Sequence, residues 1–238
     1  ILKKTQVNPS NILCLTFSTA GTKAMRERLR SLIGPEAYAI TVDTIHGFCN
    51  ELIQTYPDIF ESFQAGKQIS DIQRFRAVRS LIEELPNDSV LGRVSAAGDR
   101  TGDVLKRITQ MKREGISVPV LRKAIAQWAE EMKTTKTGKL RDQQTKSFKD
   151  DMRKVIQAEE FATIYDGYLH VMRSEHLYDY EDMIVLCTDA LREHDWLLEQ
   201  LQIRYQYVLV DEFQDLNGSQ SQFVELLTTI QSVDHEPN

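Results

Sequence analysis

The chain has 238 residues, a net charge of −6, and 27% charged and 41% hydrophobic residues, the composition of a soluble globular protein of one or two domains. No apolar run approaches the roughly 18–20 residues of a membrane span, and no secretory signal pattern is present, so we expect a cytoplasmic protein without a membrane partner. The three cysteines, Cys14, Cys49 and Cys187, are scattered without CxxC spacing. They predict buried free thiols of a reducing compartment and exclude a disulfide or zinc framework.

The net charge is distributed unevenly along the sequence. Residues 1–99 carry 11 basic and 11 acidic side chains, residues 100–154 carry 15 and 7, and residues 155–238 carry 3 and 17. The basic middle part indicates a surface that faces a polyanion, while the acidic last part indicates metal binding or simple solvation. The alternative for the middle part is a set of helices with solvated basic faces.

The first residues alternate between strand and helix patterns. We expect strands at 12–17 and 38–42, helices that end near Ile33 and cover about 48–56, and polar loops at 18–22 and 43–47. Gly34 and Pro35 stop the first helix. This order predicts an α/β fold in which helices pack on an open parallel sheet.

The alternation then gives way to helical patterns alone. We expect helices at about 71–85, 103–113, 119–132, 146–156, 159–173 and 183–191. The pattern predicts an α/β domain interrupted by an all-helical insertion. We place the first part of the α/β domain at 1–57, the insertion at 58–174, and the second part at 175–238.

A strand pattern followed by acids marks residues 205–220. Four apolar residues, 207–210, predict a strand buried on both faces, and Asp211, Glu212 and Asp215 follow at once. Ligands of parallel sheets bind beyond the carboxyl ends of the strands, so the acids predict a site for a magnesium-bound nucleotide, one carboxylate serving the metal and one a water. The alternative is a loop that merely caps the next helix, for which Ser219 is the expected N-cap.

Several segments, in order, resemble the motifs of one family. Leu15-Thr16-Phe17-Ser18 with the segment 24–29, and Thr41 to Cys49, are similar to motif Ia and the Thr-Phe-His-Ser-Phe-like motif of the UvrD/Rep-type superfamily 1 DNA helicases. Residues 210–215, VDEFQD, resemble their DExQD Walker B motif, and residues 165–168 and 179–183 resemble the segment that returns from their helical insertion. The fold that this resemblance implies is a partial RecA-like domain of the P-loop NTPase type with a helical insertion subdomain.

The resemblance assigns roles to the acids of 211–215. Mg²⁺ takes one or two protein carboxylates, which suits Asp211, and Glu212 is the candidate that polarises the attacking water. Gln214 would sense the γ-phosphate of ATP by resemblance. For Asp215 we favour a capping and loop-bracing role.

Two further loops are candidates for DNA contact. Single-stranded DNA is held by aromatic stacking and by small polar groups on phosphates, so Phe17, with Thr16 and Ser18 beside it, fits a stacking platform as in the family's motif Ia. Thr44 and His46 fit phosphate contacts, with a backbone-satisfied loop histidine as the alternative for His46. We expect Phe48 to belong to the core.

Four basic residues of the middle part lie within one helical stretch. Lys106, Arg107, Lys112 and Arg113 could follow the phosphates of duplex DNA, or they could be only solvated.

The sequence also departs from the family's pattern. No GxxxxGK[ST] loop occurs in it, and Ser18-Thr19-Ala20-Gly21 replaces a common Thr-Asn-Lys-Ala. We therefore expect a fragment without the ATP phosphate cradle and without the second RecA-like domain, inactive alone as an ATPase. The full protein is expected to be an ATP-driven 3′-to-5′ DNA helicase of repair, replication or recombination. The alternatives are the motor of a helicase–nuclease, a non-hydrolysing DNA-binding adaptor, and an unrelated magnesium-dependent hydrolase.

Overall fold

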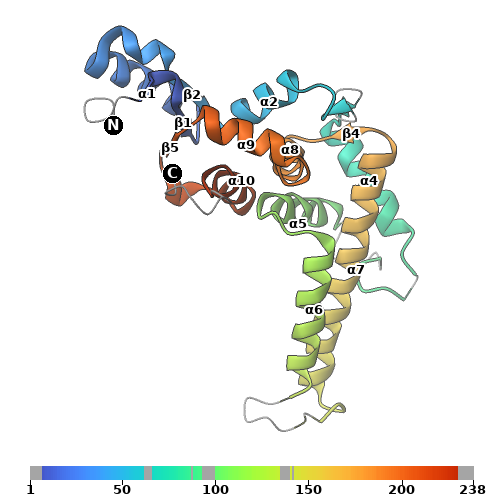
Figure 1. The fold of residues 1–238 in the computed structure, drawn as a ribbon. Helices are drawn as coiled ribbons and strands as arrows, with labels where there is room; N and C mark the ends of the chain where they lie inside the picture. The colour runs from blue at the N-terminus through green and yellow to red at the C-terminus, as the bar shows by residue number, and fades with distance from the viewer. Residues whose placement is uncertain are drawn as a thin grey trace. The chain divides into compact units, whose positions relative to one another are not determined.

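The computed structural model describes residues 7–61, 66–86, 88–92, 100–134, 140 and 142–229 (Figure 1). The chain divides into two compact units. The first comprises Ile1–Gln64 and Tyr180–Asn238, and the second comprises Ala65–Asp179. The first unit therefore draws on two stretches of sequence that flank the second.

A parallel sheet forms the centre of the first unit. Its strands are β1 (Ile12–Thr16), β2 (Thr41–Thr44) and β5 (Tyr207–Val210), in the order β2-β1-β5, and both pairings are parallel. The predicted α/β fold with a parallel sheet is confirmed. The prediction that β5 is buried on both faces is wrong, because Leu209 is 44% exposed. Within the described sheet β5 has a neighbouring strand on one side only.

The side chains of β1 alternate between the two faces of the sheet, and helices cover both of these faces. Leu13 and Leu15 pack into a core with α2 (Ile45–Thr55), α8 (Asp182–Glu193), α9 (Asp195–Arg204) and α10 (Gly218–Thr228). Ile12 and Cys14 point to the opposite face, where α1 (Thr19–Ile33) covers them. Each buried aliphatic side chain contributes about 1.5–3 kcal/mol, so β1 is held firmly in the middle layer.

The boundaries near β2 differ from those that the sequence predicted. Gly34 takes a left-handed φ of 66° and ends α1, as expected, but a 3₁₀ turn, η2 (Gly34–Ala39), follows it. β2 consequently begins at Thr41, and α2 begins at Ile45 with Thr44 as its N-cap. The prediction of a loop at His46 is wrong, because His46 lies in the first turn of α2.

The sequence patterns did not predict α9, and they predicted a different N-cap residue for α10 from the one in the structure. α9 has 10 residues, too short a window for its buried Leu197, Leu198 and Leu201 to establish a helical period. The N-cap of α10 is Asn217, not Ser219. Asn217 accepts a hydrogen bond from the Gln220 amide, while the Gln220 side chain accepts one from the Asn217 amide, which together form a capping box.

Replacing Asn217 with alanine is expected to lower the free energy of unfolding by about 1 kcal/mol, because the helix then loses the acceptor for its Gln220 amide. Urea unfolding of the variant measures the change. Glu225→Gln, at an exposed position of the same helix, is the control and should leave stability unchanged. A loss equal to that of the control would contradict the assignment of the cap.

The described residues of the second unit form mainly helices, with a two-stranded sheet at their ends. It contains α4 (Asp71–Glu83), α5 (Thr101–Arg113), α6 (Val118–Met132) and α7 (Lys146–Ser174), and β3 (Lys67–Gln68) pairs in parallel with β4 (Leu177–Tyr178). α6 and α7 run side by side (Figure 1). The predicted break between 156 and 159 is wrong. Gln157 and Ala158 are good helix formers, so α7 continues through them for 29 residues.

The three cysteines are buried free thiols, as predicted. Burial raises the pKa of Cys14 to about 11. Burial also raises the pKa of Cys49, and the neighbouring thiol of Cys187 adds to the effect. Because the reactive thiolate is disfavoured, Cys14 and Cys49 act as small packing groups. Among the described residues, no helix combines the length and the apolar character that a membrane span needs.

Candidate functional site

The candidate residues of the first unit converge because three parallel strands end at one edge. Thr16 is the register partner of Thr44, and Leu15 is the partner of Val210. The amide of Asp211 extends this ladder by donating to the carbonyl of Leu15 at 2.9 Å. The segments that follow β1, β2 and β5 therefore leave the sheet at the same level, the place where parallel α/β sheets bind ligands.

The turn after β5 holds its acids on a strained backbone. Glu212 has φ 52° and ψ 45°, a left-handed conformation that costs about 1–3 kcal/mol for such a residue. The 3₁₀ turn η3 (Phe213–Asp215) follows it, and the amide of Asp215 donates to the Glu212 carbonyl at 2.8 Å. The side chain of Gln214 donates to the Glu212 carboxylate. Strain of this kind is typical of functional sites, where the surrounding structure maintains it.

The acids fit a magnesium ion that is shared with phosphates. Asp211, Glu212 and Asp215 are all exposed to solvent. The described residues contain no group of three or more His, Cys, Asp or Glu side chains arranged to enclose a metal. Mg²⁺ needs no such cage, since it takes one or two carboxylates and completes its shell with water and substrate phosphates. The expected role of Asp215 in capping α10 falls instead to Asn217.

The loop after β1 presents an aromatic side chain. Phe17 is 56% exposed, which leaves its ring free to stack on a base. Ser18 is the N-cap of α1, and its hydroxyl accepts from the Gly21 amide at 3.1 Å. The structure contradicts the predicted DNA contact of Thr16. Its side chain is buried, and its hydroxyl bonds to the Thr22 hydroxyl at 2.8 Å and to the Ser18 carbonyl at 3.0 Å. The Thr16 hydroxyl thus braces the loop from inside and does not face DNA.

The segment after β2 places a second ring at the same edge. Thr44 accepts from the Gly47 amide at 2.9 Å, and half-buried His46 follows in the first turn of α2. The His46 ring stacks on Tyr180, with centroids 3.9 Å apart and 15° between the planes. Phe48 is buried in the core, as expected.

Tyr180 is the residue that the sequence reasoning missed. Its side chain is 54% exposed, and burial of the rest raises the pKa of its phenol, with the Glu181 carboxylate adding to the shift. The phenol therefore stays neutral at physiological pH. In the sequence, Tyr180 could have been noticed as an aromatic residue within a segment, 179–183, that resembles a family motif. Only the fold shows that this aromatic lies against His46.

Asp43 shapes the turn between β2 and α2. Its carboxylate accepts from the Thr44 amide at 2.7 Å and lies close to the start of α2, where negative charge is favourable. A Cβ on Gly47 would lie 2.2 Å from the Asp43 Oδ1 atom, so only glycine fits here without displacing the carboxylate. The turn thus depends on Asp43, Thr44 and Gly47 together.

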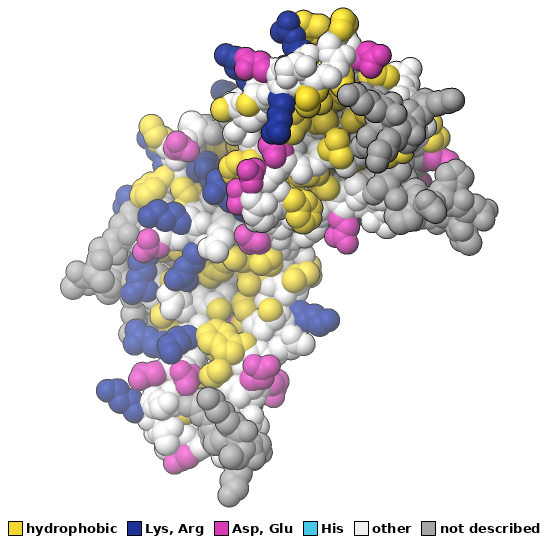
Figure 2. All heavy atoms as spheres, turned by 90° about the vertical axis from the view of Figure 1, so that its left-hand side faces the viewer, with side chains coloured by type: hydrophobic (Ala, Val, Ile, Leu, Met, Phe, Trp, Pro, Cys, Tyr) yellow, Lys and Arg dark blue, Asp and Glu magenta, His cyan; other side chains and the backbone are white. Residues whose placement is uncertain are grey.

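The basic residues of α5 do not share one environment. Lys106, Arg107 and Arg113 are exposed, and Figure 2 shows Lys and Arg side chains interspersed with acids on the helical unit. Lys112 differs from these three residues, because it is buried and its ammonium lies 2.9 Å from the Asp179 carboxylate. A buried, ion-paired lysine does not contact a duplex. The prediction for Lys112 is therefore wrong.

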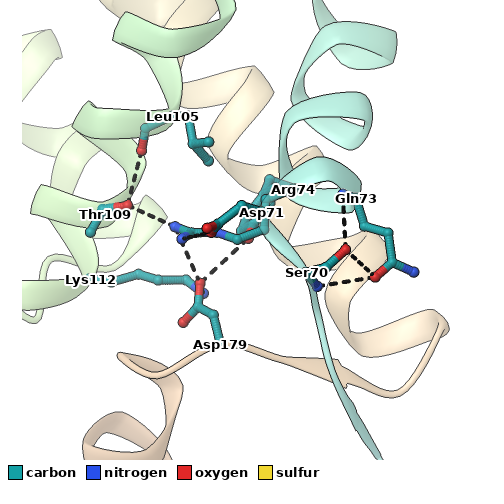
Figure 3. Close-up of polar contacts among 9 residues, drawn as sticks. Ser70, Asp71, Gln73, Arg74, Leu105, Thr109, Lys112 and Asp179 are labelled. Atoms are coloured by element: carbon teal, nitrogen blue, oxygen red, sulfur yellow. Dashed lines mark hydrogen bonds and ion pairs between the residues drawn. The ribbon is translucent and has the colours of Figure 1, made fainter.

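A buried polar network surrounds Lys112 in the second unit (Figure 3). Arg74 and Lys112 converge on Asp179, with Arg74 at 3.8 Å from the carboxylate. Arg74 also donates to the Thr109 hydroxyl at 2.8 Å. The Tyr168 hydroxyl donates to Asp179 at 3.4 Å, and burial raises the pKa of this phenol, which keeps the proton in place. The network joins α4, α5 and α7 to the end of β4.

The fold and the strand-end loops define the chain as a RecA-like α/β domain with a helical insertion. Comparison with known families narrows this class. The family described as UvrD/REP helicase N-terminal domain matches residues 1–233. The chain therefore belongs to that family.

Curated relatives agree with this assignment. The chain is 26% identical to ATP-dependent DNA helicase PcrA of Staphylococcus epidermidis over 227 residues, which cover 95% of the chain and 26% of the relative. It is 25% identical to ATP-dependent DNA helicase PcrA of Staphylococcus aureus over 229 residues, which cover 96% of the chain and 27% of the relative. The chain thus spans about a quarter of the length of these relatives.

Proposed function

We propose that residues 1–238 supply the metal-binding and water-activating acids, and part of the DNA surface, of an ATP-dependent DNA helicase that moves 3′ to 5′. The observation that supports this most is the common sheet edge. There the Asp211–Glu212 turn and the exposed ring of Phe17 follow strands that are direct neighbours. Such proximity would let DNA binding and nucleotide hydrolysis influence each other. The matched helicase family and the PcrA relatives support the same function.

The acids divide the chemistry of phosphoryl transfer between them. Asp211 would hold Mg²⁺, which when bound neutralises charge on the ATP phosphates. Glu212 would accept a proton from the attacking water, a role worth about 10²–10⁴-fold in rate. Gln214 donates to the Glu212 carboxylate and so orients it, while one amide hydrogen remains for a phosphate oxygen.

The DNA surface uses stacking and phosphate contacts. Phe17 offers one ring, and Tyr180 offers another whose orientation is fixed by its stack on His46. Stacking binds bases without regard to their sequence, as a translocating motor requires. Ser18, Thr44 and His46 are proposed to contact phosphates. Lys106, Arg107 and Arg113 are proposed to contact duplex DNA, and Lys112 is not.

Glu212→Gln is expected to lower the DNA-stimulated ATPase rate by about 10²–10⁴-fold while DNA affinity is retained, because only the proton acceptor is lost. The assay uses the natural gene product that contains residues 1–238. Glu225→Gln, the same change at an exposed position of α10, serves as the control and should retain full activity. An unchanged rate in Glu212→Gln would exclude Glu212 as the water-activating group.

The 238 residues by themselves are proposed to hydrolyse no ATP, because no GxxxxGK[ST] phosphate cradle occurs among them. Phosphate release by the isolated chain with Mg²⁺ and DNA should equal the background. Robust turnover that disappears in Glu212→Gln would show that this chain binds the triphosphate by other residues.

A further inference from the structure

A groove of about 340 Å³ lies on the surface of the helical unit, apart from the sheet edge and from the buried network of Asp179. One wall is α4, and the other is formed by the end of α7 and by β4. All of its lining residues lie between 69 and 177, so the groove belongs to one compact unit. Neither the nucleotide chemistry nor the DNA contacts proposed above use it.

The two helices that form the walls run in opposite directions. Gly167 of α7 meets Leu81 of α4, where a Cβ on the glycine would lie 2.8 Å from the Leu81 side chain. About two turns further along, Glu175 lies beside the start of α4, because β3 leads into α4 and pairs with β4 directly after α7. Gly167 therefore lets the helices approach closely at one end, and the β3–β4 ladder holds them together at the other.

The floor of the groove is apolar and already in place. Buried Ile69 and half-buried Ala77, Leu81 and Leu177 all belong to the hydrophobic core of this unit. Packing against the core fixes their inner sides, while their outer sides line the groove. A preformed apolar surface loses little conformational entropy when a partner covers it. The floor is therefore suited to dock the apolar side chains of a partner.

Charged side chains lie at both ends of this floor. Glu84 follows the last residue of α4 and Glu175 the last residue of α7, and these are opposite ends of the groove because the helices are antiparallel. Arg76 lies between them on the α4 wall. All three side chains are exposed, and within the described part of the chain no ion pair engages them. The groove thus presents an acid, a base and an acid in succession.

The length of the groove matches about three turns of helix. From Gln73 to Glu84 the α4 wall advances by 11 residues, or about 16 Å at 1.5 Å per residue. An amphipathic helix of this length presents an apolar stripe through residues spaced three and four apart. The backbone groups of the helical walls are already paired within their helices, so the groove offers side chains to a partner and little backbone. This favours a helix over an extended strand as the occupant.

We propose that this groove docks an amphipathic helix of a partner protein that carries a basic residue at each end of its apolar stripe and an acidic residue between them. The basic residues pair with Glu84 and Glu175, and the acidic residue pairs with Arg76. Nucleic acid is disfavoured here because two of the three charges repel phosphates. The inference does not depend on the proposed catalytic or DNA-binding roles.

The probe is a labelled synthetic helical peptide of about 16 residues, with leucines spaced three and four apart, two lysines about 11 residues apart and one glutamate between them. Fluorescence anisotropy measures its binding to the natural gene product that contains residues 1–238. Binding should be saturable, and hydrogen exchange of backbone amides should slow in α4 and at the end of α7. Absence of saturable binding, or protection confined to other segments, would overturn the proposal.

Ser80→Trp fills the groove from an exposed position of its wall and should reduce peptide affinity by about tenfold or more. Ile72→Trp is the matched control, because Ile72 is a 66% exposed residue of α4 outside the groove lining, and it should leave the affinity unchanged. Both variants should melt at the wild-type temperature, since the altered side chains are exposed. Equal losses of affinity in the two variants would contradict docking in the groove.

A charge exchange tests the ion pairs themselves. Glu84→Lys/Glu175→Lys should weaken peptide binding by about 2- to 30-fold through the loss of two exposed ion pairs. A second peptide, with glutamates in place of the two lysines, should bind this double variant better than it binds the wild type. Glu114→Lys changes an exposed acid of the same unit outside the groove and should bind both peptides as the wild type does.

The remaining outcomes count against the proposal. If the double variant loses the first peptide but does not gain the second, the two carboxylates do not select the partner's charges. If Ser80→Trp and the double variant alter oligonucleotide affinity and leave peptide affinity unchanged, the groove is part of the DNA surface and the inference is wrong.

Discussion

Replacing Phe17 with alanine is expected to weaken binding of single-stranded DNA by about 5- to 150-fold, because a stacked aromatic contributes about 1–3 kcal/mol per base. The ring follows the central strand directly and is 56% exposed, so its loss removes a ligand contact and leaves the core intact. The variant should accordingly melt at the wild-type temperature. Its DNA affinity, measured by anisotropy, should fall alike for every base composition.

Trp196→Ala provides the matched control for Phe17→Ala. Trp196 belongs to the same unit and is 53% exposed, but it lies at the start of α9, where its ring meets the edge of Tyr56. Its removal should leave DNA affinity unchanged. Equal losses in the two variants would mean that Phe17 acts through general surface apolarity or folding, and would contradict a stacking platform.

Asp179→Asn is expected to destabilise the helical unit by about 3–5 kcal/mol, because the buried Lys112 ammonium then loses the charge of the carboxylate that lies 2.9 Å from it. The Arg74 guanidinium and the Tyr168 hydroxyl lose the same partner. Removal of one member of a buried charge group costs far more than the pair contributes net, since the remaining charge cannot return to water. The effect should therefore be among the largest of any single substitution in this unit.

The two tryptophans allow each unit to be followed separately. Trp128 lies in the helical unit and Trp196 in the other, so urea unfolding of Asp179→Asn in a Trp196→Phe background reports the helical unit alone. Asp71→Asn is the matched control, because Asp71 also faces Arg74, at 3.7 Å, with a side chain that is 96% exposed. It should change stability by less than about 0.5 kcal/mol. Comparable shifts in both variants would show that burial of Asp179 is not decisive.

The sequence predicted the layers of the fold because apolar period and turn residues depend on local chemistry. The parallel strands, the end of α1 at Gly34 and the core position of Phe48 all follow from such local patterns. Boundaries were less accurate where two patterns overlap. The start of α2 was placed three residues late because a polar run, 43–47, contains both a strand end and a helix cap.

Individual side-chain roles were harder to predict because they depend on partners far along the chain. Lys112 has the neighbours of a solvated helix face, and only Asp179, 67 residues later, makes it a buried cation. Tyr180 lies against His46 although 134 positions separate them. Thr16 and Phe17 are neighbours at the end of β1, yet the side chain of Thr16 is buried and that of Phe17 is exposed. The direction of each side chain at the strand end decides whether it enters the core or the solvent.

The short ladder between β3 and β4 has a consequence for the order of folding. It pairs Lys67 with Leu177, so the segments that begin and end the helical unit lie on neighbouring strands, about 4.8 Å apart. Once the helical unit has folded, this pairing shortens the chain that separates β1 from β5 from about 190 residues to about 80. The entropy cost of bringing β1 and β5 together then falls by about 0.8 kcal/mol. This arrangement favours formation of the inserted unit before completion of the sheet that flanks it in sequence.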